Sequence, residues 1–441
     1  MTVGTNNAAS PLWAKPGAAA ASAETADAMA FMSRDDVILD RELFPFDIRA
    51  TRAHVNGLAS IGLIERGDAD RIGGALSELD ERFASGAFVL DERFEDGHTA
   101  IESFLVEKLG ETGKRVHLGR SRNDQVAVAL RLYMMEVLDR ARLSCLAIGR
   151  AALGVARAHE FDPMPGYTHL QRAVPSTVGL WMGSFAEGFA DCAALCALTR
   201  SWIDASPLGT AAGYGVNLPL ARESVADELG FARLQVNPMA TQSSRGRLEH
   251  QVVATLWQAM QEVRRLAWDY SLFSAEEFGF VTLGAGFVTG SSIMPNKKNP
   301  DMAELLRASC AVVGGAMGEI QQAMSLPSGY HRDLQITKPA FVRAAKVSLE
   351  AMAHIPRLIE TATLHTERMA SAMDPAMFAT DHAVKLAGEG VPFRDAYVRA
   401  AEAIAGMRPE DCDAETSVRA RVSPGGCGAL MLDAIEARLT V

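Results

Sequence analysis

Residues 178–196 read VGLWMGSFAEGFADCAALC, and this stretch decides the fold. Its large apolar side chains recur at alternating steps of four and three residues: Val178, Met182, Phe185, Phe189, Cys192 and Cys196. That spacing places them on one face of an α-helix and is typical of a helix that packs nearly parallel to its neighbours. The stretch therefore predicts one long helix of a bundle.

Four further stretches show the same periodicity. One begins at the polar segment 121–124, whose side chains suit a helix start, and another covers residues 248–273. Two more follow Pro300 and Pro339, and the second is expected to kink at Pro356, because proline removes a backbone donor. Five long helices predict a mostly α fold with a central long-helix bundle.

Composition shifts and Gly and Pro breaks divide the chain into a loosely held arm and three helical parts. We predict an N-terminal arm at residues 1–30, a small N-terminal helical domain at 31–118, a central long-helix bundle domain at 119–373 and a small C-terminal helical domain at 374–441. Small residues among the large ones of 178–196 favour packing against bundles of other chains, hence a homo-oligomer. An isolated five-helix core is the alternative.

The composition of the 441 residues excludes several classes of protein. A net charge of −11 is a poor field for nucleic acid, so any anionic ligand must be met by a local cluster of Lys and Arg. Six cysteines give neither a disulfide framework nor a metal-ligand pattern, and we predict no metal. With no apolar run of about 18 residues and no signal-peptide pattern, we expect a soluble cytoplasmic protein that binds no membrane.

The most unusual segment is the loop 284–300, GAGFVTGSSIMPNKKNP, which separates two long helices. Its glycines, two serine hydroxyls and paired lysines suit a loop that closes over an anionic ligand. The alternative is a solvated helix connection. Loops of this length inside compact helical proteins are usually functional or disordered, so we favour the first interpretation.

Three more segments at helix ends carry chemistry. In 163–175, PMPGYTHLQRAVP, a compact turn presents His169 as a candidate acid or base, with a capping or solvent-facing histidine as the alternative. The segments 119–125, GRSRNDQ, and 328–338, SGYHRDLQITK, add Arg and Lys side chains. The positive end of a helix favours anions, although simple capping explains 119–125 equally well. Together the segments predict local recognition of an anion.

These motifs resemble those of a known superfamily. GSSIMPNKKNPD at 290–301 resembles the signature loop of the fumarase/aspartase superfamily, while HLGRSRNDQV, GYTHLQRAVPS and LPSGYHRDLQ resemble the argininosuccinate lyase family. The resemblance covers roughly residues 31–400. It implies a homotetramer of three-part helical subunits, with each active site assembled from several subunits. It also implies reversible β-elimination of argininosuccinate to arginine and fumarate, a step of arginine biosynthesis that needs no metal or organic cofactor.

The resemblance also implies roles for individual residues. Ser291 is the base, Lys297 faces the negative charge of the aci-carboxylate intermediate, and His169, oriented by Glu304, handles the proton of the leaving nitrogen. Ten further residues are expected to bind the substrate: His98, Arg122, Asn123, Thr168, Gln171, Asn299, Tyr330, Arg332, Gln335 and Lys338.

Several positions depart from the family pattern. The largest departures are the segment 237–251 and Asp36, which stands where a substrate-binding Ser is expected. Smaller ones are Leu118 for Thr, His331 for Asn, and Ile336 and Thr337 for a Glu-Asp pair. They leave the elimination machinery intact and predict a divergent branch. The competing interpretations are another superfamily lyase, such as adenylosuccinate lyase, and a structural homologue that has lost catalysis. GRSRNDQ argues against the first, and the retained catalytic set argues against the second.

Overall fold

The computed structural model describes residues 31, 35–408 and 412–440. The chain forms two compact units, and neither is continuous in sequence. Unit 1 contains the described residues up to 139, with 198–254 and 315–345; unit 2 contains 140–197, 255–314 and the described residues from 346 onward. The expected arm, 1–30, lies outside the described residues. The predicted division into domains at residues 31, 119 and 374 stays a prediction.

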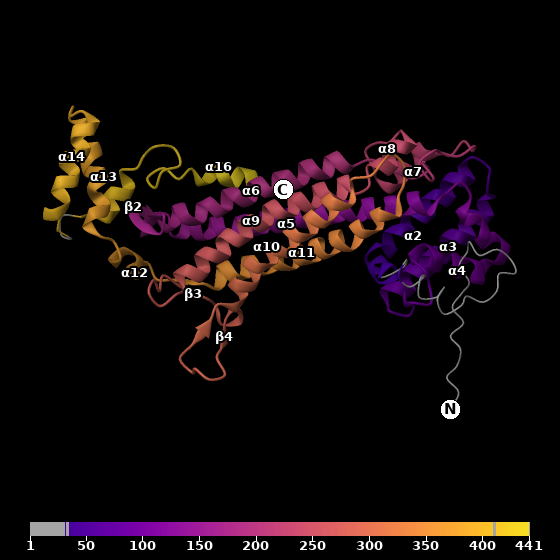
Figure 1. Cartoon of the computed structure of the whole chain (residues 1–441), viewed down its shortest axis with the longest axis horizontal. Helices are drawn as coiled ribbons and strands as arrows, with labels where there is room; N and C mark the ends of the chain where they lie inside the picture. Colours follow the sequence, from indigo (N-terminus) through magenta and orange to yellow (C-terminus); the bar gives the residue numbers. More distant parts are fainter. Residues whose placement is uncertain (1–30, 32–34, 409–411, 441) are drawn as a thin grey trace. The chain divides into compact units, whose positions relative to one another are not determined.

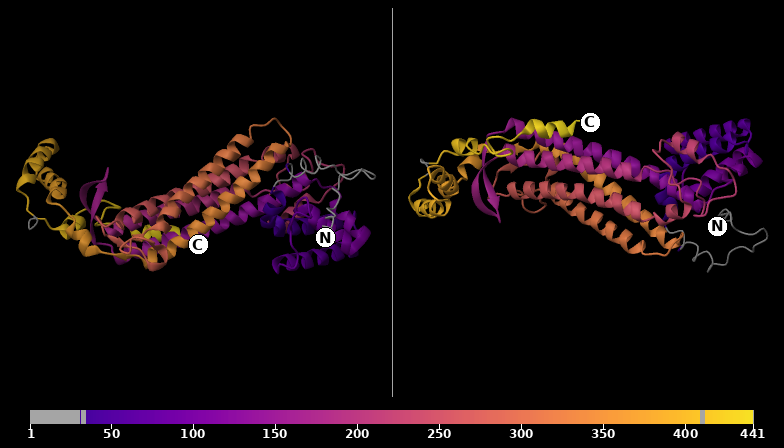
Figure 2. Two further views of the ribbon diagram at one scale, coloured as in Figure 1. Left: turned by 60° about the horizontal axis from the view of Figure 1, so that its bottom comes forward. Right: turned by 90° about the horizontal axis from the view of Figure 1, so that it is seen from above.

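Five long helices confirm the predicted mostly α fold. They are α5 Arg122–Ala158, α6 Val178–Ile203, α9 Arg247–Phe273, α10 Asp301–Ala323 and α11 Thr337–Thr361. Each contributes one part to each unit, and within each unit these parts run side by side (Figures 1 and 2). All six apolar residues whose spacing predicted α6 are buried. These six side chains therefore form part of the core, as their helical spacing predicted.

Unit 1 surrounds its bundle segments with shorter elements. These are α2 Asp36–Ser60, α3 Arg66–Ala84, α4 Gly97–Leu109, η1 Gly110–His117, α7 Arg222–Leu229, α8 Pro238–Ser243 and η3 Arg332–Ile336. Helices α2, α3 and α4 share one hydrophobic core, in which Phe44 lies 4.8 Å from Phe83 between ring centroids. Gly62 and Gly86, at φ of 73° and 77°, follow α2 and α3, because a left-handed residue at that position favours glycine.

The start of α5 is fixed by a reciprocal pair of capping hydrogen bonds. Asp124 Oδ1 accepts from the backbone of Ser121 at 2.9 Å, and Ser121 Oγ accepts from the backbone of Asn123 at 3.3 Å. The second oxygen of Asp124 accepts from the backbone of Gly209 and Ala211, at 3.1 and 2.9 Å. Capping by the polar segment 121–124 is therefore confirmed, and the same carboxylate fixes a loop 85 residues away.

Unit 2 holds its helices together with polar as well as apolar contacts. The indole of Trp181 on α6 donates to Asp269 Oδ2 on α9 at 2.8 Å. The guanidinium of Arg307 on α10 lies 4.0 Å from the centroid of the Trp268 ring on α9. Because an indole N–H or a cation over a ring face needs a defined geometry, these contacts fix how the helices meet.

Within the described residues, three short two-stranded antiparallel sheets interrupt the helices of unit 2, and the first and third are hairpins. They are β1 Pro163–Thr168 with β2 Gln171–Thr177, β3 Val281–Thr282 with β6 Thr363–Leu364, and β4 Thr289–Gly290 with β5 Lys298–Asn299. The first corrects the prediction of a compact turn between two helices. A turn is present, but it is the tip of a hairpin, where His169 and Leu170 have φ of 55° and 58°. Two left-handed residues suit the twist of a hairpin.

The remaining helical elements of unit 2 are short. They are η2 Ala285–Phe287, α12 Thr366–Ser371, η4 Pro375–Phe378, α13 Ala379–Gly388, α14 Phe393–Ala403, η5 Ile404–Gly406, α15 Ala414–Arg419 and α16 Leu432–Leu439. Helix α16 is tied to α5, because Arg157 forms ion pairs with Asp433 and Glu436 at 2.7 and 2.6 Å.

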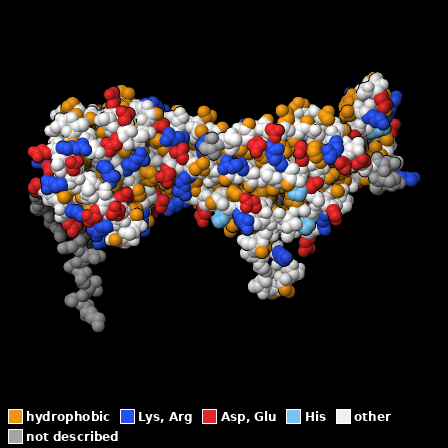
Figure 3. Space-filling view, turned by 180° about the vertical axis from the view of Figure 1, so that it is seen from behind, with side chains coloured by type: hydrophobic (Ala, Val, Ile, Leu, Met, Phe, Trp, Pro, Cys, Tyr) orange, Lys and Arg blue, Asp and Glu red, His pale blue; other side chains and the backbone are white. Residues whose placement is uncertain are grey.

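The surface mixes charges of both signs. On the face seen in Figure 3, Lys and Arg side chains are interspersed with Asp and Glu. That face therefore shows no continuous basic area of the kind that nucleic-acid binding needs. Within the described ranges, no helix combines the length and the apolar composition that crossing a bilayer requires.

Candidate active site

The predicted site residues fall into two sets, one in each unit. Unit 1 holds His98, Arg122, Asn123, Tyr330, Arg332, Gln335 and Lys338. Unit 2 holds Thr168, His169, Gln171, Ser291, Lys297, Asn299 and Glu304.

Lys338 is the centre of the set in unit 1. Its ammonium group is buried at the start of α11 and lies 2.7 Å from a carboxylate oxygen of both Asp36 and Asp40 on α2. Burial alone would lower the pKa of Lys338, but the two carboxylates outweigh burial and raise it. Asp40 also accepts a backbone hydrogen bond from Gly97 at 2.8 Å. Lys338 is therefore charged and already paired.

Asp36 connects this ion pair to two more predicted residues. Its Oδ2 accepts from Gln335 Nε2 at 2.5 Å, and Gln335 Oε1 accepts from Arg332 Nε at 3.0 Å. Burial, with repulsion from Asp40, raises the pKa of Asp36 in spite of Lys338. The structure thus brings Arg332, Gln335 and Lys338 together through one carboxylate.

His98 lies in the first turn of α4 and is buried against α2. Its Nδ1 lies 2.5 Å from Asp47 Oδ2. Burial lowers the pKa of His98, but Asp47, followed by Asp96 and Asp40, outweighs burial and raises the pKa to about 9. His98 is therefore an imidazolium at neutral pH, and it donates to Asp47.

Arg122 is also paired with carboxylates. Its guanidinium lies 3.0 Å from Glu95 and 3.2 Å from Asp96, and it donates to Thr99 Oγ1 at 3.1 Å. Although burial raises the pKa of Asp96, the charges of His98 and Arg122 outweigh it and lower that pKa. These pairs fix the loop before α4 to the first turn of α5.

Arg120 corrects the predicted anion-binding cluster. Its side chain is buried and donates to Thr51 Oγ1 at 2.9 Å, so it serves packing within unit 1. Burial lowers its pKa, and its charge in turn adds to the effect of burial on His54, whose pKa falls to about 3. Arg122 and Lys338 are already neutralised by carboxylates. Arg120, Arg122 and Lys338 thus already have partners within unit 1, whereas Arg332 is exposed.

Sequence reasoning singled out Asp36 on α2 but missed Asp40 and Asp47, although a signal was present. Asp36, Asp40 and Asp47 recur at steps of four and seven residues, which places them on one helical face. Such a face is usually solvated, so the pattern alone indicates little. The structure adds that Asp40 and Asp47 are buried. Three acidic residues at helical spacing on a buried face are a sign of buried basic partners.

The signature loop forms a hairpin in unit 2, with Thr289 paired to Asn299 and Gly290 paired to Lys298. Figure 1 shows this hairpin, labelled β4, projecting from the bundle. Ser291 Oγ accepts hydrogen bonds from the backbone of Met294 at 3.1 Å and Ile293 at 3.4 Å. Two donors on one hydroxyl oxygen stabilise negative charge there. The geometry is that of a serine turn.

The two other charged residues predicted around this loop are exposed. Within the described part of the chain, Lys297 forms no ion pair, and its backbone donates to Met294 at 3.1 Å. Glu304 lies on the first turn of α10 and pairs with Arg307 at 3.3 Å. The ammonium of Lys297 is thus open to a ligand.

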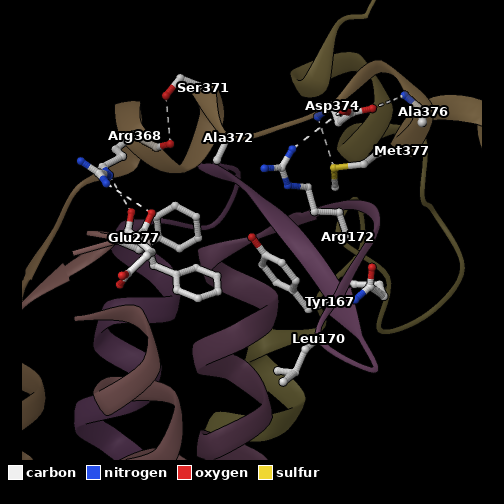
Figure 4. Close-up of a pocket in the computed structure, with 13 residues that line it drawn as sticks. Tyr167, Leu170, Arg172, Glu277, Arg368, Ser371, Ala372, Asp374, Ala376 and Met377 are labelled. Atoms are coloured by element: carbon white, nitrogen blue, oxygen red, sulfur yellow. Dashed lines mark hydrogen bonds and ion pairs between the residues drawn. The ribbon is translucent and has the colours of Figure 1, made fainter. Parts of the chain in front are cut away.

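His169 projects at the tip of the first hairpin and is exposed, as are Thr168 and Gln171. Beside the tip lies an open cavity of about 820 Å³ within unit 2, which Figure 4 shows. Gln171 and Arg172 line it on the hairpin side, and Arg172 points toward Asp374, 3.8 Å away. Arg368 lies on the opposite wall and donates to the backbone of the 276–278 turn. The cavity shares one residue, Gln171, with the predicted set.

Comparison with known proteins shows what this chain is similar to. Residues 21–315 match the family described as Lyase. Argininosuccinate lyase of Sorangium cellulosum (strain So ce56) is 51% identical over 428 residues, 97% of this chain and 98% of that enzyme. Argininosuccinate lyase of Xylella fastidiosa (strain 9a5c) is 49% identical over 427 residues, 97% of this chain and 95% of that enzyme. The chain belongs to the argininosuccinate lyase family.

Solved structures confirm the fold of this member of the argininosuccinate lyase family. A crystal structure of EDDS lyase in complex with formate superposes with a TM-score of 0.78 at 24% identity, covering 93% of this chain and 89% of the other. Fumarate lyase from Mesorhizobium sp. BNC1 gives 0.68 at 18% identity, covering 94% and 93%. These likenesses show the fold, and the predicted membership of the fumarase/aspartase superfamily is confirmed by the argininosuccinate lyase relatives and the family match.

Each unit holds its share of the residues that the resemblance assigns to one site among partners of its own. Within unit 2, the ion pair that Glu304 forms among the described residues is with Arg307, not with His169. Ser291 takes its hydrogen bonds from its own loop. Unit 1 assembles His98, Gln335 and Lys338 around α2, while Asn123 and Tyr330 occupy half-buried positions at the start of α5 and before η3.

Proposed function

We propose that this protein is an argininosuccinate lyase, which cleaves argininosuccinate reversibly to arginine and fumarate by β-elimination. One observation carries the proposal: enzymes of that name are about half identical to this chain along nearly the whole length of both. The residues that the resemblance assigns to the elimination are all present in the sequence.

The chemistry assigns a role to each group of unit 2. Ser291, as alkoxide, removes a proton from the succinyl carbon beside a carboxylate, and the backbone donors on its Oγ lower the cost of the alkoxide. Lys297, which has no ion pair among the described residues, offsets the charge of the aci-carboxylate. The carbon–nitrogen bond then breaks as the double bond of fumarate forms. His169 supplies the proton to the departing guanidino nitrogen, oriented by Glu304.

The substrate-binding set and a homotetramer belong to the same proposal. Arg122, Asn123, Tyr330, Gln335 and Lys338 bind substrate with His98, Thr168, Gln171, Asn299 and Arg332. Each site draws segments from different subunits. Exposure of His169 and Glu304 supports this arrangement, because both remain open to residues of another chain. Cytoplasmic location is proposed as the setting.

Release of fumarate, followed by its ultraviolet absorbance, tests the activity. We expect turnover of argininosuccinate and none of adenylosuccinate assayed in parallel. Ser291→Ala should reduce kcat by about 10³-fold or more, because it removes the base. Ser292→Ala, a neighbouring hydroxyl in the same loop, is the matched control. Turnover of adenylosuccinate alone would overturn the function, and full activity of Ser291→Ala would overturn the role of Ser291.

A further inference from the structure

Asp36 is the carboxylate that a ligand can reach among those around Lys338. Its side chain is 20% exposed, whereas those of Asp40 and Lys338 are 6% and 5% exposed. It also contacts two side chains, Gln335 and Lys338, that belong to the proposed substrate-binding set. A ligand that approaches these residues therefore meets Asp36.

The charges at this point favour a cationic group. Two carboxylates, Asp36 and Asp40, face the single ammonium of Lys338, so the cluster carries a negative excess. Lys338 already directs hydrogen bonds at both carboxylates, and Asp40 is occupied further by the backbone of Gly97. A third carboxylate, brought by a ligand, would be repelled here. An ammonium group would be attracted and would add a donor to Asp36.

Two further carboxylates of unit 1, Asp47 eleven residues along α2 from Asp36 and Glu95 before α4, have oxygens without donors in the described part of the chain. Asp47 Oδ1 and Glu95 Oε2 are buried, and neither has a hydrogen-bond partner within the described residues. Buried carboxylate oxygens without donors are costly, and they are usually satisfied by protein, water or a ligand. Spare acceptor capacity thus remains on Asp47 and Glu95, apart from the cluster around Lys338.

We propose that Asp36 determines substrate specificity by binding the α-ammonium group of the arginine half of the substrate. The proposal rests on the function proposed above and adds a requirement to it: the substrate must carry a free, charged α-amino group. The serine expected at this position could offer a hydroxyl to either the ammonium or the carboxylate of an amino acid. A carboxylate at the same position discriminates between the two, because its charge attracts only the ammonium.

The test compares two substrates that differ in this one group. The first is argininosuccinate, and the second is its deamino analogue, in which hydrogen replaces the α-amino group. Fumarate release gives kcat/KM for both with the wild type, Asp36→Asn and the control Asp35→Asn. Asp35 is the exposed neighbour just before α2. Losing a charge-assisted hydrogen bond should cut the wild-type preference for argininosuccinate about tenfold to a hundredfold in Asp36→Asn. Asp35→Asn should keep the wild-type preference.

Each outcome is decisive for one claim. An unchanged substrate ratio in a folded Asp36→Asn overturns the role of Asp36, and it leaves the proposed lyase activity standing as long as the wild type cleaves argininosuccinate. A wild type that cleaves neither compound overturns the function itself. Asp36→Asn places a new amide beside the amide of Gln335. The second variant, Asp36→Ser, removes the carboxylate without adding an amide there. Circular dichroism identifies the variant that retains the fold, and the ratio is measured on that variant.

Discussion

The buried pair of His98 and Asp47 makes the stability of unit 1 depend on pH in a defined direction. The pKa of His98 is raised from 6.5 to about 9, so the folded state holds a proton that the unfolded state releases earlier. Stabilisation is therefore complete below about pH 6.5 and is lost as the pH rises through about 9. The difference of roughly 2.5 pKa units corresponds to about 3 kcal/mol of unfolding free energy.

Asp47→Asn removes the carboxylate that raises this pKa, and urea unfolding followed by circular dichroism measures the effect. The difference in unfolding free energy between wild type and variant should shrink by about 3 kcal/mol between pH 6 and pH 10. Other ionisable groups cancel in this difference, and a fixed protein concentration removes the effect of association. A difference that stays constant, or that grows with pH, would refute the inference that His98 is charged in the folded protein.

Three other changes test the packing around the site and in the bundle. Burial and the charge of Arg120 lower the pKa of His54 to about 3, so the neutral ring stabilises the fold above about pH 6.5, and this stabilisation is lost in acid. In urea unfolding between pH 7 and pH 4, the unfolding free energy of the wild type should therefore fall by about 3 kcal/mol more than that of His54→Gln. Arg131→Met removes three hydrogen bonds made by a buried guanidinium, so it should lower the unfolding free energy by about 3 kcal/mol or more in the same assay. As the control, Arg66→Met at an exposed position should change the unfolding free energy little. Trp181→Phe leaves Asp269 without its indole donor and should lower the thermal midpoint; an unchanged midpoint would show that Asp269 finds another donor.

Helix positions could be predicted from sequence because their signal is local. Apolar residues at steps of three and four predicted all five long helices, and the predicted start in the polar segment 121–124 agrees with the observed α5. The hairpin around His169 escaped prediction, because Pro165 and Pro175 interrupt the alternation expected of strands. The structure pairs those two prolines with each other across the hairpin.

The partners of the site residues could not be predicted in the same way. Lys338 and Asp40 are 298 residues apart in the sequence, and Asp36 and Gln335 are 299 apart. Composition indicated that cations gather for an anionic ligand, but charge alone does not show whether a cation faces a ligand or a carboxylate of its own chain. Arg120, Arg122 and Lys338 are all occupied within unit 1.

The discontinuity of the two units sets an order of events during synthesis. The core shared by α2, α3 and α4 uses residues between Val37 and Val116, so it can close while most of the chain is still unmade. Lys338 is translated 222 residues after Val116, about 10–45 s later at ordinary elongation rates. During that interval Asp36 and Asp40 lack their counter-ion, and the bundle helices lack their neighbours. A ribosome-bound chain stopped in this window should resist proteases over α2–α4 and be cut along α5 and α6.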